Sequence, residues 1–288
     1  MIKGIGALVL TAASLLNAQT LNTSSPAALA GAGEPLLGFA LNSAGDHLYK
    51  VLGTGAHPRF GEPVPLPPGT NQVHLPPLQR FALLTGSDGS LAVLHLNRTD
   101  PMTEAAQPIR GAWTHPDSVI FSPTGLSVAL YSAAKQRLQI LTGLPDAPRV
   151  MRELATAAES VSAFAVTDDA ELVVAEFENG SPYFSRQGNR WEPMATGIRP
   201  RAWQFLPRSR ELAASDAFQN EIVLLADVTA APVPARTLAS NVLADHLAAT
   251  ADADEIMAAS ASTGAARWSW PVGGSPLPTA TRSGRSAG

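Results

Sequence analysis

The feature that most constrains the fold of this chain is a repeated pattern of about forty residues. In its clearest copy, the apolar residues 119–121 meet a Ser-Pro-Thr-Gly turn and continue into a second apolar segment, 126–130. A third segment with alternating apolar residues follows at 137–141. Apolar residues at every second position are typical of strands with one buried face, and Pro and Gly between them are typical of turns. This copy therefore predicts three consecutive strands.

The same layout can be placed around six anchor residues, which are spaced 34, 46, 45, 39 and 45 residues apart. The anchors are Gly45, Gln79, Gly125, Ala170, Ser209 and Asp254. Eleven of the twelve residues four and six positions before the anchors are apolar, and so are all residues three positions after them. Positions that differ by two share one face of a strand, so this face is predicted to be buried in every repeat. In all repeats but the first, a third strand is predicted, at 91–96, 138–141, 182–185, 222–225 and 266–270.

Repeats of this length with three or four strands are typical of propeller blades, because one small sheet cannot bury both of its faces alone. We therefore predict an all-β propeller of about six blades, or seven, with three to four antiparallel strands in each, over residues 36–272. Residues 19–35 would close a ring of six as an outer strand of the last blade. A pair of β-sandwiches is the main structural alternative.

The Phe-Ser-Pro-Thr-Gly segment at 121–125, together with the residues after it, resembles the repeats of bacterial exported WD-type and YVTN-type propellers. The resemblance extends over residues 36–272 and is best around Gly125. The chain contains no Trp-Asp dipeptide, so the resemblance implies the fold and not a particular activity.

The two ends of the chain are predicted to lie outside the folded domain. Lys3, the apolar run 5–16 and the small residue Ala18 predict a signal peptide over residues 1–18, and hence a periplasmic or secreted protein. An uncleaved anchor or a short core helix is the alternative, and no later segment resembles a membrane span. Residues 19–35 are predicted to be a linker, and the Gly-, Ser- and Pro-containing residues 273–288 a disordered tail.

Composition excludes several classes of function. A net charge of −4 and a pI near 5.9 offer no basic surface of the kind that nucleic-acid backbones require, so no nucleic-acid partner is predicted. The chain has no cysteine, which rules out disulfides, thiolate catalysis and Cys-ligated zinc. With 23 Gly and 24 Pro, it is rich in turn-forming residues, which favours an all-β fold.

Motifs with possible chemistry have simpler structural interpretations. Ser132 and Lys135 have the Ser-x-x-Lys spacing of penicillin-recognising enzymes, but they fall between two predicted strands, where we expect a hairpin turn. The acidic pair Asp168 and Asp169 and the acidic segment 252–255 would suit calcium, yet they lie in inter-strand turns and are interpreted as solvated. The six histidines lack the short spacing of a zinc site. We therefore predict no catalytic residue, metal ligand or cofactor.

One repeated position is a stronger candidate for function. Eight residues before each anchor, the innermost strand begins, and in a propeller these starts surround the mouth of the central channel. Five of the six residues there are polar, the exception being Leu37. The structural explanation is that the strand leaves the core at this point. The functional one is that these side chains converge on a polar hollow where a ligand binds. The candidate ligand-binding residues are Asn71, Asp117, Ser162, Arg201 and His246.

Two functions are compatible with these residues. The first, which we favour, is an exported propeller that binds or scaffolds an unidentified protein or small molecule without catalysis. The alternative resembles the exported propeller lactonases, which hold a divalent ion at the channel mouth. That resemblance implies Asp117 and Asn71 as ligands and His246 as a base. One carboxylate is few for calcium, which takes six to eight oxygens, so the enzyme is the less favoured hypothesis.

Overall fold

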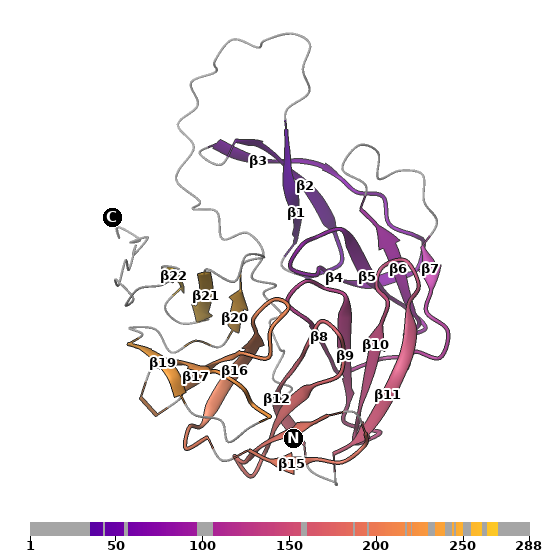
Figure 1. Ribbon diagram of the computed structural model, residues 1–288. Coiled ribbons are helices and arrows are strands. Elements are labelled where there is room, and N and C mark those ends of the chain that lie inside the picture. The colour runs from indigo at the N-terminus through magenta and orange to yellow at the C-terminus, as the bar shows by residue number, and fades with distance from the viewer. Residues whose placement is uncertain are drawn as a thin grey trace, which may run out of the picture.

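The computed structural model describes the chain from Pro35 to Ser269 with several gaps (Figure 1). The described ranges are 35–42, 44–54, 57–96, 106–156, 160–186, 188–194, 196–216, 218–219, 221–229, 234–239, 244, 246–249, 255–260 and 264–269. The predicted signal peptide, all of the linker except Pro35, and the tail lie outside these ranges, and these assignments stay predictions. No helix within the described ranges is long and apolar enough to cross a membrane.

The described residues form small antiparallel sheets of three or four strands, in each of which the strands follow chain order. We name the first five of them blades 1 to 5. Blades 1 and 2 are β1 (Leu36–Leu41), β2 (Leu48–Thr54) and β3 (His57–Pro63), then β4 (Thr70–His74), β5 (Phe81–Gly86), β6 (Leu91–His95) and β7 (Gln107–Pro108). Blade 3 is β8 (Ser118–Phe121), β9 (Ser127–Ser132), β10 (Arg137–Thr142) and β11 (Arg149–Ala155). Blade 4 is β12 (Val161–Val166), β13 (Val173–Phe177), β14 (Pro182–Ser185) and β15 (Glu192–Pro193). Blade 5 is β16 (Pro200–Phe205), β17 (Leu212–Asp216), β18 (Glu221–Leu225) and β19 (Pro234–Ala239). A last sheet contains β20 (His246–Ala249), β21 (Glu255–Ser260) and β22 (Gly264–Ser269).

The sheets are arranged around a common centre, with the first strand of each innermost. The strands β8, β12, β16 and β20 contact one another in turn, whereas β7, β11 and β15 lie at the rim (Figure 1). This arrangement confirms the predicted all-β propeller with blades of three to four antiparallel strands. The alternative of a pair of β-sandwiches is wrong, because no two large sheets pack face to face within the described residues.

The predicted number of blades is wrong. The sequence predicts six or seven, whereas five blades, β1 to β19, precede a smaller last sheet. The strands of that sheet are rich in alanine, for example Glu-Ile-Met-Ala-Ala-Ser in β21. Alanine buries much less apolar area than valine or leucine, so this repeat contributes little core of its own. It packs on blade 5 through Leu247, Ile256 and Ala258.

The anchors lie in the turn between the first and second strands of each blade, as predicted. In all five described turns the anchor N–H donates to the carbonyl oxygen three residues earlier, at 3.0–3.3 Å. Gly45, Gln79, Gly125 and Ala170 have positive φ, and in blade 5 Arg208, the neighbour of Ser209, has it instead. We call the end of the propeller with these turns the turn end, and the opposite end, where the innermost strands begin, the mouth.

The third strands are also seen, with bounds within two residues of those predicted from the sequence. The exception is blade 1, where β3 forms although no third strand was predicted. Its sequence, His-Pro-Arg-Phe-Gly-Glu-Pro, contains two prolines and has no buried residue. Proline is tolerated on an edge strand because one row of backbone groups there needs no partner in the sheet. The strand is therefore present without an apolar pattern.

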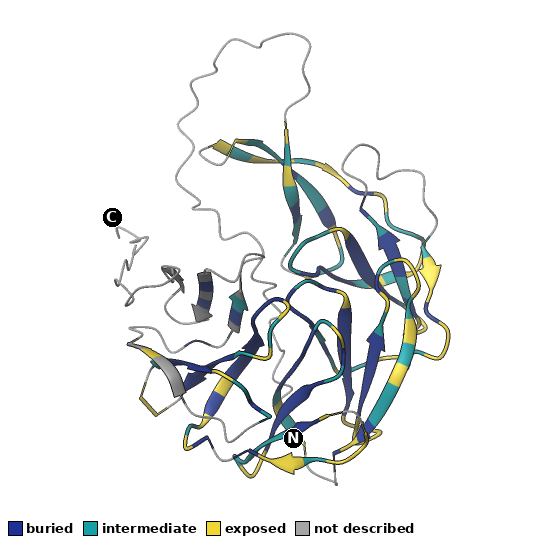
Figure 2. Cartoon of the chain, in the orientation of Figure 1, coloured by how far each residue is buried: buried dark blue, intermediate teal, exposed yellow. Residues whose placement is uncertain are grey.

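The core lies between the blades. Five clusters of buried apolar side chains connect each sheet with the next one. The second strands are the most buried: all residues of β9, β13 and β17 are shielded from solvent, because neighbouring sheets cover both of their faces (Figure 2). The short outer strands β7 and β15 are exposed (Figure 2). The predicted buried face of the innermost strands is present, with Phe39, Val73 and Trp203 at most 5% exposed.

Candidate functional site

The predicted ring residues occupy a repeated β-bulge. In four blades the pairing of the innermost strand shifts by one residue at this position, between Leu36 and Gly38 in blade 1, for example. The residues at the shift are Leu37, Asn71, Ser162 and Arg201. In blade 3, Asp117 and Ser118 both oppose Tyr131, since the Asp117 N–H donates to the Tyr131 oxygen at 2.8 Å. A bulge of this kind redirects a side chain out of the sheet.

The bulges bring polar groups to the surface at the mouth. The side chains of Leu37, Asn71, Asp117, Ser162 and Arg201 are all exposed. The sixth candidate, His246, begins β20, and its side chain lies outside the described part of the chain. Two of the candidates, Ser162 and Arg201, line one pocket, and Asn71 and Asp117 do not belong to its lining.

Asp117 has a structural contact. Its Oδ2 accepts the backbone N–H of Ala133 at 2.7 Å, in the turn between β9 and β10. The same turn contains Lys135, whose N–H donates to Ser132 Oγ at 3.4 Å. The interpretation of the Ser-x-x-Lys spacing as a hairpin turn is therefore confirmed, and the Asp117 carboxylate holds this turn on the start of β8.

The pocket lies at the mouth between blades 4 and 5 and has a volume of about 450 Å³. Its lining combines charged, small and apolar residues: Ser162, Glu176, Phe177, Glu178, Gly180, Arg199, Pro200 and Arg201. Blade 4 provides one wall, from β12, β13 and the turn after β13. The other wall is the start of β16 in blade 5 and the segment before it. The two walls thus belong to independent sheets that are held together by the core between them.

Glu176 lies on the blade 4 wall and is the most unusual of these residues. It is 5% exposed, in a strand that is otherwise Val-Val-Ala and Phe. Ser162 Oγ donates a hydrogen bond to its Oε2 at 2.8 Å. Burial raises the pKa of Glu176, an effect that the Ser162 hydrogen bond and the positive charge of Arg199 partly oppose. A buried carboxylate with so little compensation costs stability, and such groups are concentrated at functional sites.

Arg199 and Arg201 bring positive charge to the opposite wall. The Arg199 guanidinium lies over Gly180, where a Cβ would be 3.5 Å from the Arg199 Nε. Gly180 has a φ of 77°, so the backbone conformation of the turn after β13 favours glycine. The Arg199 guanidinium also lies 5.7 Å from the centre of the Phe218 ring, at a distance typical of a cation–π contact. Two arginines on one wall and two glutamates on the other therefore line the pocket.

The turn end differs from the mouth because its charged groups are engaged in contacts between blades. Asp168 Oδ1 accepts the N–H and the Oγ1–H of Thr124 in blade 3, at 2.8 and 2.7 Å. Its Oδ2 accepts the Arg208 N–H in blade 5 at 3.1 Å. The carboxylate thus connects three consecutive blades. The interpretation as a solvated turn is wrong for Asp168, which is half-buried, and holds for Asp169, which is exposed.

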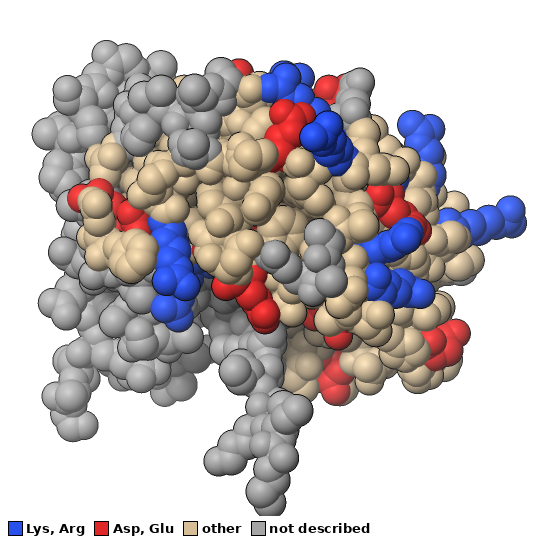
Figure 3. Space-filling model, turned by 90° about the horizontal axis from the view of Figure 1, so that it is seen from below, with Lys and Arg blue, Asp and Glu red and all other residues tan. Residues whose placement is uncertain are grey.

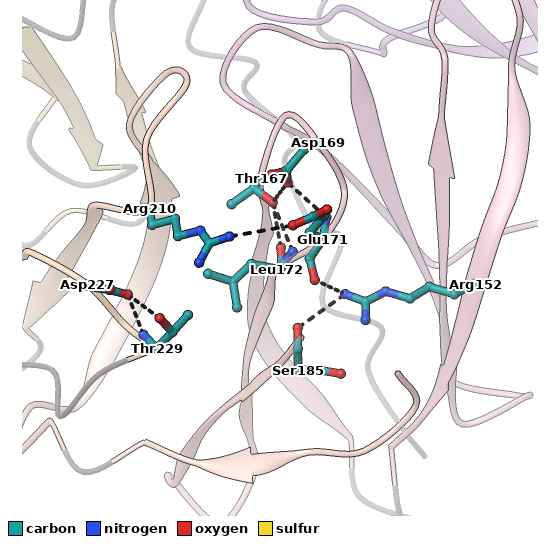
Figure 4. A network of polar contacts seen from close by, with 9 residues as sticks. All are labelled: Arg152, Thr167, Asp169, Glu171, Leu172, Ser185, Arg210, Asp227 and Thr229. Carbon is teal, nitrogen blue, oxygen red and sulfur yellow. Dashed lines mark hydrogen bonds and ion pairs between the residues drawn. The ribbon is translucent and has the colours of Figure 1, made fainter. Parts of the chain in front are cut away.

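Further contacts connect the same blades (Figure 4). Asp169 Oδ1 accepts the Thr167 hydroxyl and the Glu171 N–H, and Arg210 of blade 5 forms an ion pair with Glu171 at 3.6 Å. The Arg152 guanidinium, on β11 of blade 3, donates to the backbone oxygens of Glu171 and Ser185 at 2.9 and 3.2 Å. Charged side chains elsewhere are interspersed, with no large area of one sign on the face seen in Figure 3.

The hydrolase hypothesis requires a set of ligands for a divalent ion at the mouth, and the described residues do not provide one. Within the described ranges, no group of three or more His, Asp or Glu could hold a metal ion. Asp117, the carboxylate assigned to that ion, is hydrogen-bonded to the Ala133 N–H. The described residues at the mouth therefore do not fit such an ion.

The chain matches no protein-family model, and no curated protein matches it. The resemblance to WD-type and YVTN-type repeats thus rests on the segment around Gly125 and stays a prediction. What the structure does establish is an all-β propeller with a charged pocket between two of its blades.

Proposed function

We propose that this protein is a binding module whose ligand site is the pocket between blades 4 and 5. The observation that supports this most is the burial of Glu176, a carboxylate inside an apolar strand at the pocket wall, with Ser162 as its hydrogen-bond donor. Small-molecule sites are typically hollows of roughly 300–1,000 Å³, and the volume of this pocket, about 450 Å³, lies within that range.

The fold supports the proposal because it holds the two walls rigidly. Each wall lies on a blade with a packed core on both sides. The contacts of Asp168 at the turn end connect the same two blades. A rigid site loses little conformational entropy when its ligand binds, which favours recognition over a large conformational change.

Three finer features belong to the proposal as well. Export to the periplasm or beyond is proposed from residues 1–18, and membership of the WD-type or YVTN-type propellers from the Gly125 repeat. Closure of the ring by residues N-terminal to β1 is proposed from the three-stranded blade 1 and last sheet. The metal-dependent hydrolase stays the alternative function, and no contact of the described residues favours it.

A ligand screen tests the proposal. A panel of amino acids, amines, carboxylic acids, sugars and nucleosides would be added to the purified protein, and the midpoint of thermal unfolding measured. A ligand at about 100 times its Kd stabilises a protein by about 2.7 kcal/mol, which corresponds to a shift of several degrees. We expect at least one compound to raise the midpoint of the wild type, and Glu176→Gln to abolish this shift.

The control is Glu192→Gln, which removes a carboxylate from an exposed position on β15 of the same blade. This variant should keep the full ligand response. A ligand shift that Glu176→Gln leaves intact, or no shift with any compound, would count against a binding site in this pocket.

A further inference from the structure

The pocket separates its charges by blade. Both of its carboxylates, Glu176 and Glu178, come from β13 and the turn after it. Both of its guanidinium groups, Arg199 and Arg201, come from the start of β16 and the residue before that strand. A ligand between the walls therefore has an acidic surface on one side and a basic surface on the other.

Within the described part of the chain, Glu176 on the acidic wall has no direct contact with Arg199 of the basic wall that would neutralise its charge. The charge of Arg199 acts on the Glu176 carboxylate, but among the described residues the two side chains form neither a hydrogen bond nor an ion pair. Ser162 Oγ is the group that bonds the carboxylate, at Oε2. Glu176 and Arg199 both line the 450 Å³ pocket.

Each wall has the chemistry to bind one charged end of a small molecule. A buried carboxylate has lost much of its hydration, and an ammonium group within hydrogen-bond distance offsets that loss. A guanidinium group binds a carboxylate through two parallel hydrogen bonds, and Arg is preferred over Lys for that reason. A ligand with one charge of each sign would present its ammonium group to the acidic wall and its carboxylate to the basic wall.

We infer that the ligand is a small zwitterion of the amino-acid type, with its ammonium group at Glu176 and its carboxylate at Arg199. This inference rests on the proposed function and names the ligand class for the same pocket. The Ser162 hydroxyl orients the Glu176 carboxylate, and the Arg199 guanidinium lies beside Gly180 in the turn after β13.

A homologous series of probes tests the inference. Glycine, β-alanine, 4-aminobutanoate and 6-aminohexanoate place the two charges at increasing separation, and binding of each would be measured by calorimetric titration. Butylamine and butanoate carry one charge each. We expect one member of the series to bind at least tenfold more tightly than either single-charge probe. Its N-acetyl and carboxamide derivatives should both lose that advantage.

Paired variants assign each charge to its wall. Glu176→Gln should weaken the best zwitterion at least tenfold and eliminate the binding of butylamine, whereas Arg199→Gln should weaken the zwitterion and butanoate. The matched controls are Glu192→Gln and Arg190→Gln, both on the exposed side of blade 4, which should bind as the wild type does. Circular dichroism of every variant confirms that it is folded.

The outcomes separate the inference from the proposed function. If a single-charge probe or a neutral compound binds as tightly as every zwitterion, and Glu176→Gln removes that binding, the ligand class is wrong and the site stands. If no member of the series binds, but another compound of the wider panel binds and Glu176→Gln removes that binding, the ligand class is again wrong and the site stands. If no binding depends on Glu176 or Arg199, both proposals are wrong.

Discussion

The two ends of this propeller use charged residues in opposite ways. At the turn end, both oxygens of the Asp168 carboxylate accept hydrogen bonds from neighbouring blades. At the mouth, the more deeply buried carboxylate of Glu176 has a single hydrogen-bond donor, Ser162, among the described side chains. A carboxylate whose bonding capacity is used within the protein contributes to stability, whereas one that is buried with capacity to spare reduces it. The comparison supports the proposal that the turn end holds the blades together and that the mouth binds a ligand.

Removal of the Asp168 carboxylate should have the largest effect on stability. Asp168→Ala eliminates three hydrogen bonds and leaves the N–H groups of Thr124 and Arg208 without this acceptor. Hydrogen bonds to charged groups contribute about 1.5–3 kcal/mol each, and partial exposure reduces this, so we expect a loss of about 3 kcal/mol. Urea denaturation measures it, with the exposed Asp146→Ala as the control. A loss below about 1 kcal/mol would show that the turn end is not held by this carboxylate.

Acid should weaken the turn end through His74, the last residue of β4. Burial lowers the pKa of this imidazole from 6.5 to about 4. The folded state therefore binds fewer protons than the unfolded state between these values, and stability falls as the pH drops from about 6.5 toward 4. The full difference corresponds to roughly 3 kcal/mol, of which about 2 should be lost by pH 5.

The measurement compares the free energy of unfolding at pH 7 and pH 5 for the wild type and for His74→Leu. The variant should lack this part of the pH dependence, while His57→Gln, at an exposed position in β3, should retain it. Equal pH dependence in the wild type and His74→Leu would contradict the prediction.

At the mouth, removal of a charge should have the opposite effect on stability, because it should raise the free energy of unfolding. Glu176→Gln eliminates a buried charge and keeps a side chain of the same size, so we expect stability at pH 7 to rise by up to about 1 kcal/mol. Because burial raises the pKa of Glu176, the folded state keeps its proton to higher pH, and the wild type should lose stability relative to the variant as the pH rises from 4 to 7. Urea denaturation at both pH values tests this. A clear destabilisation by Glu176→Gln would place this carboxylate with Asp168 as a structural group.

The smallest effect is expected for Asp117, which lies at the mouth but has a structural contact. Asp117→Ala removes one hydrogen bond to the exposed Ala133 N–H and should cost about 1 kcal/mol. The ligand response of the pocket and the metal content of the protein, measured by elemental analysis, should not change. A bound divalent ion that is lost in Asp117→Ala would instead support the hydrolase hypothesis.

The strands were predictable to the extent that they are buried. The second strands, such as β9 and β13, are covered on both faces and appear in the sequence as mainly apolar segments. The edge strands β7 and β15 are Gln-Pro and Glu-Pro, both exposed, and they have no apolar pattern from which they could be predicted. β3 was missed for the same reason. Burial generates the sequence signal, so an edge strand that buries little generates almost none.

The candidate site was predictable in part. Two of the residues eight positions before the anchors, Ser162 and Arg201, line the pocket, and their role as ligand-binding residues stays a prediction. Glu176 and Arg199 were missed. The sequence does contain one signal for Glu176, a carboxylate within the apolar segment 173–177, because a charge inside a buried strand is costly and needs an explanation. Arg199 has no comparable signal, since its role depends on which turn lies opposite.

By itself, the sequence determined that the chain folds as a series of small antiparallel sheets, because alternating apolar residues and turn residues act over a few neighbouring positions. It also determined where each innermost strand leaves the core. Only the tertiary structure decided which polar residues meet across the blades: Asp168 with Thr124 and Arg208, and Glu176 opposite Arg199. These contacts join residues of different repeats, and their geometry depends on how one blade packs against the next, which no local pattern contains.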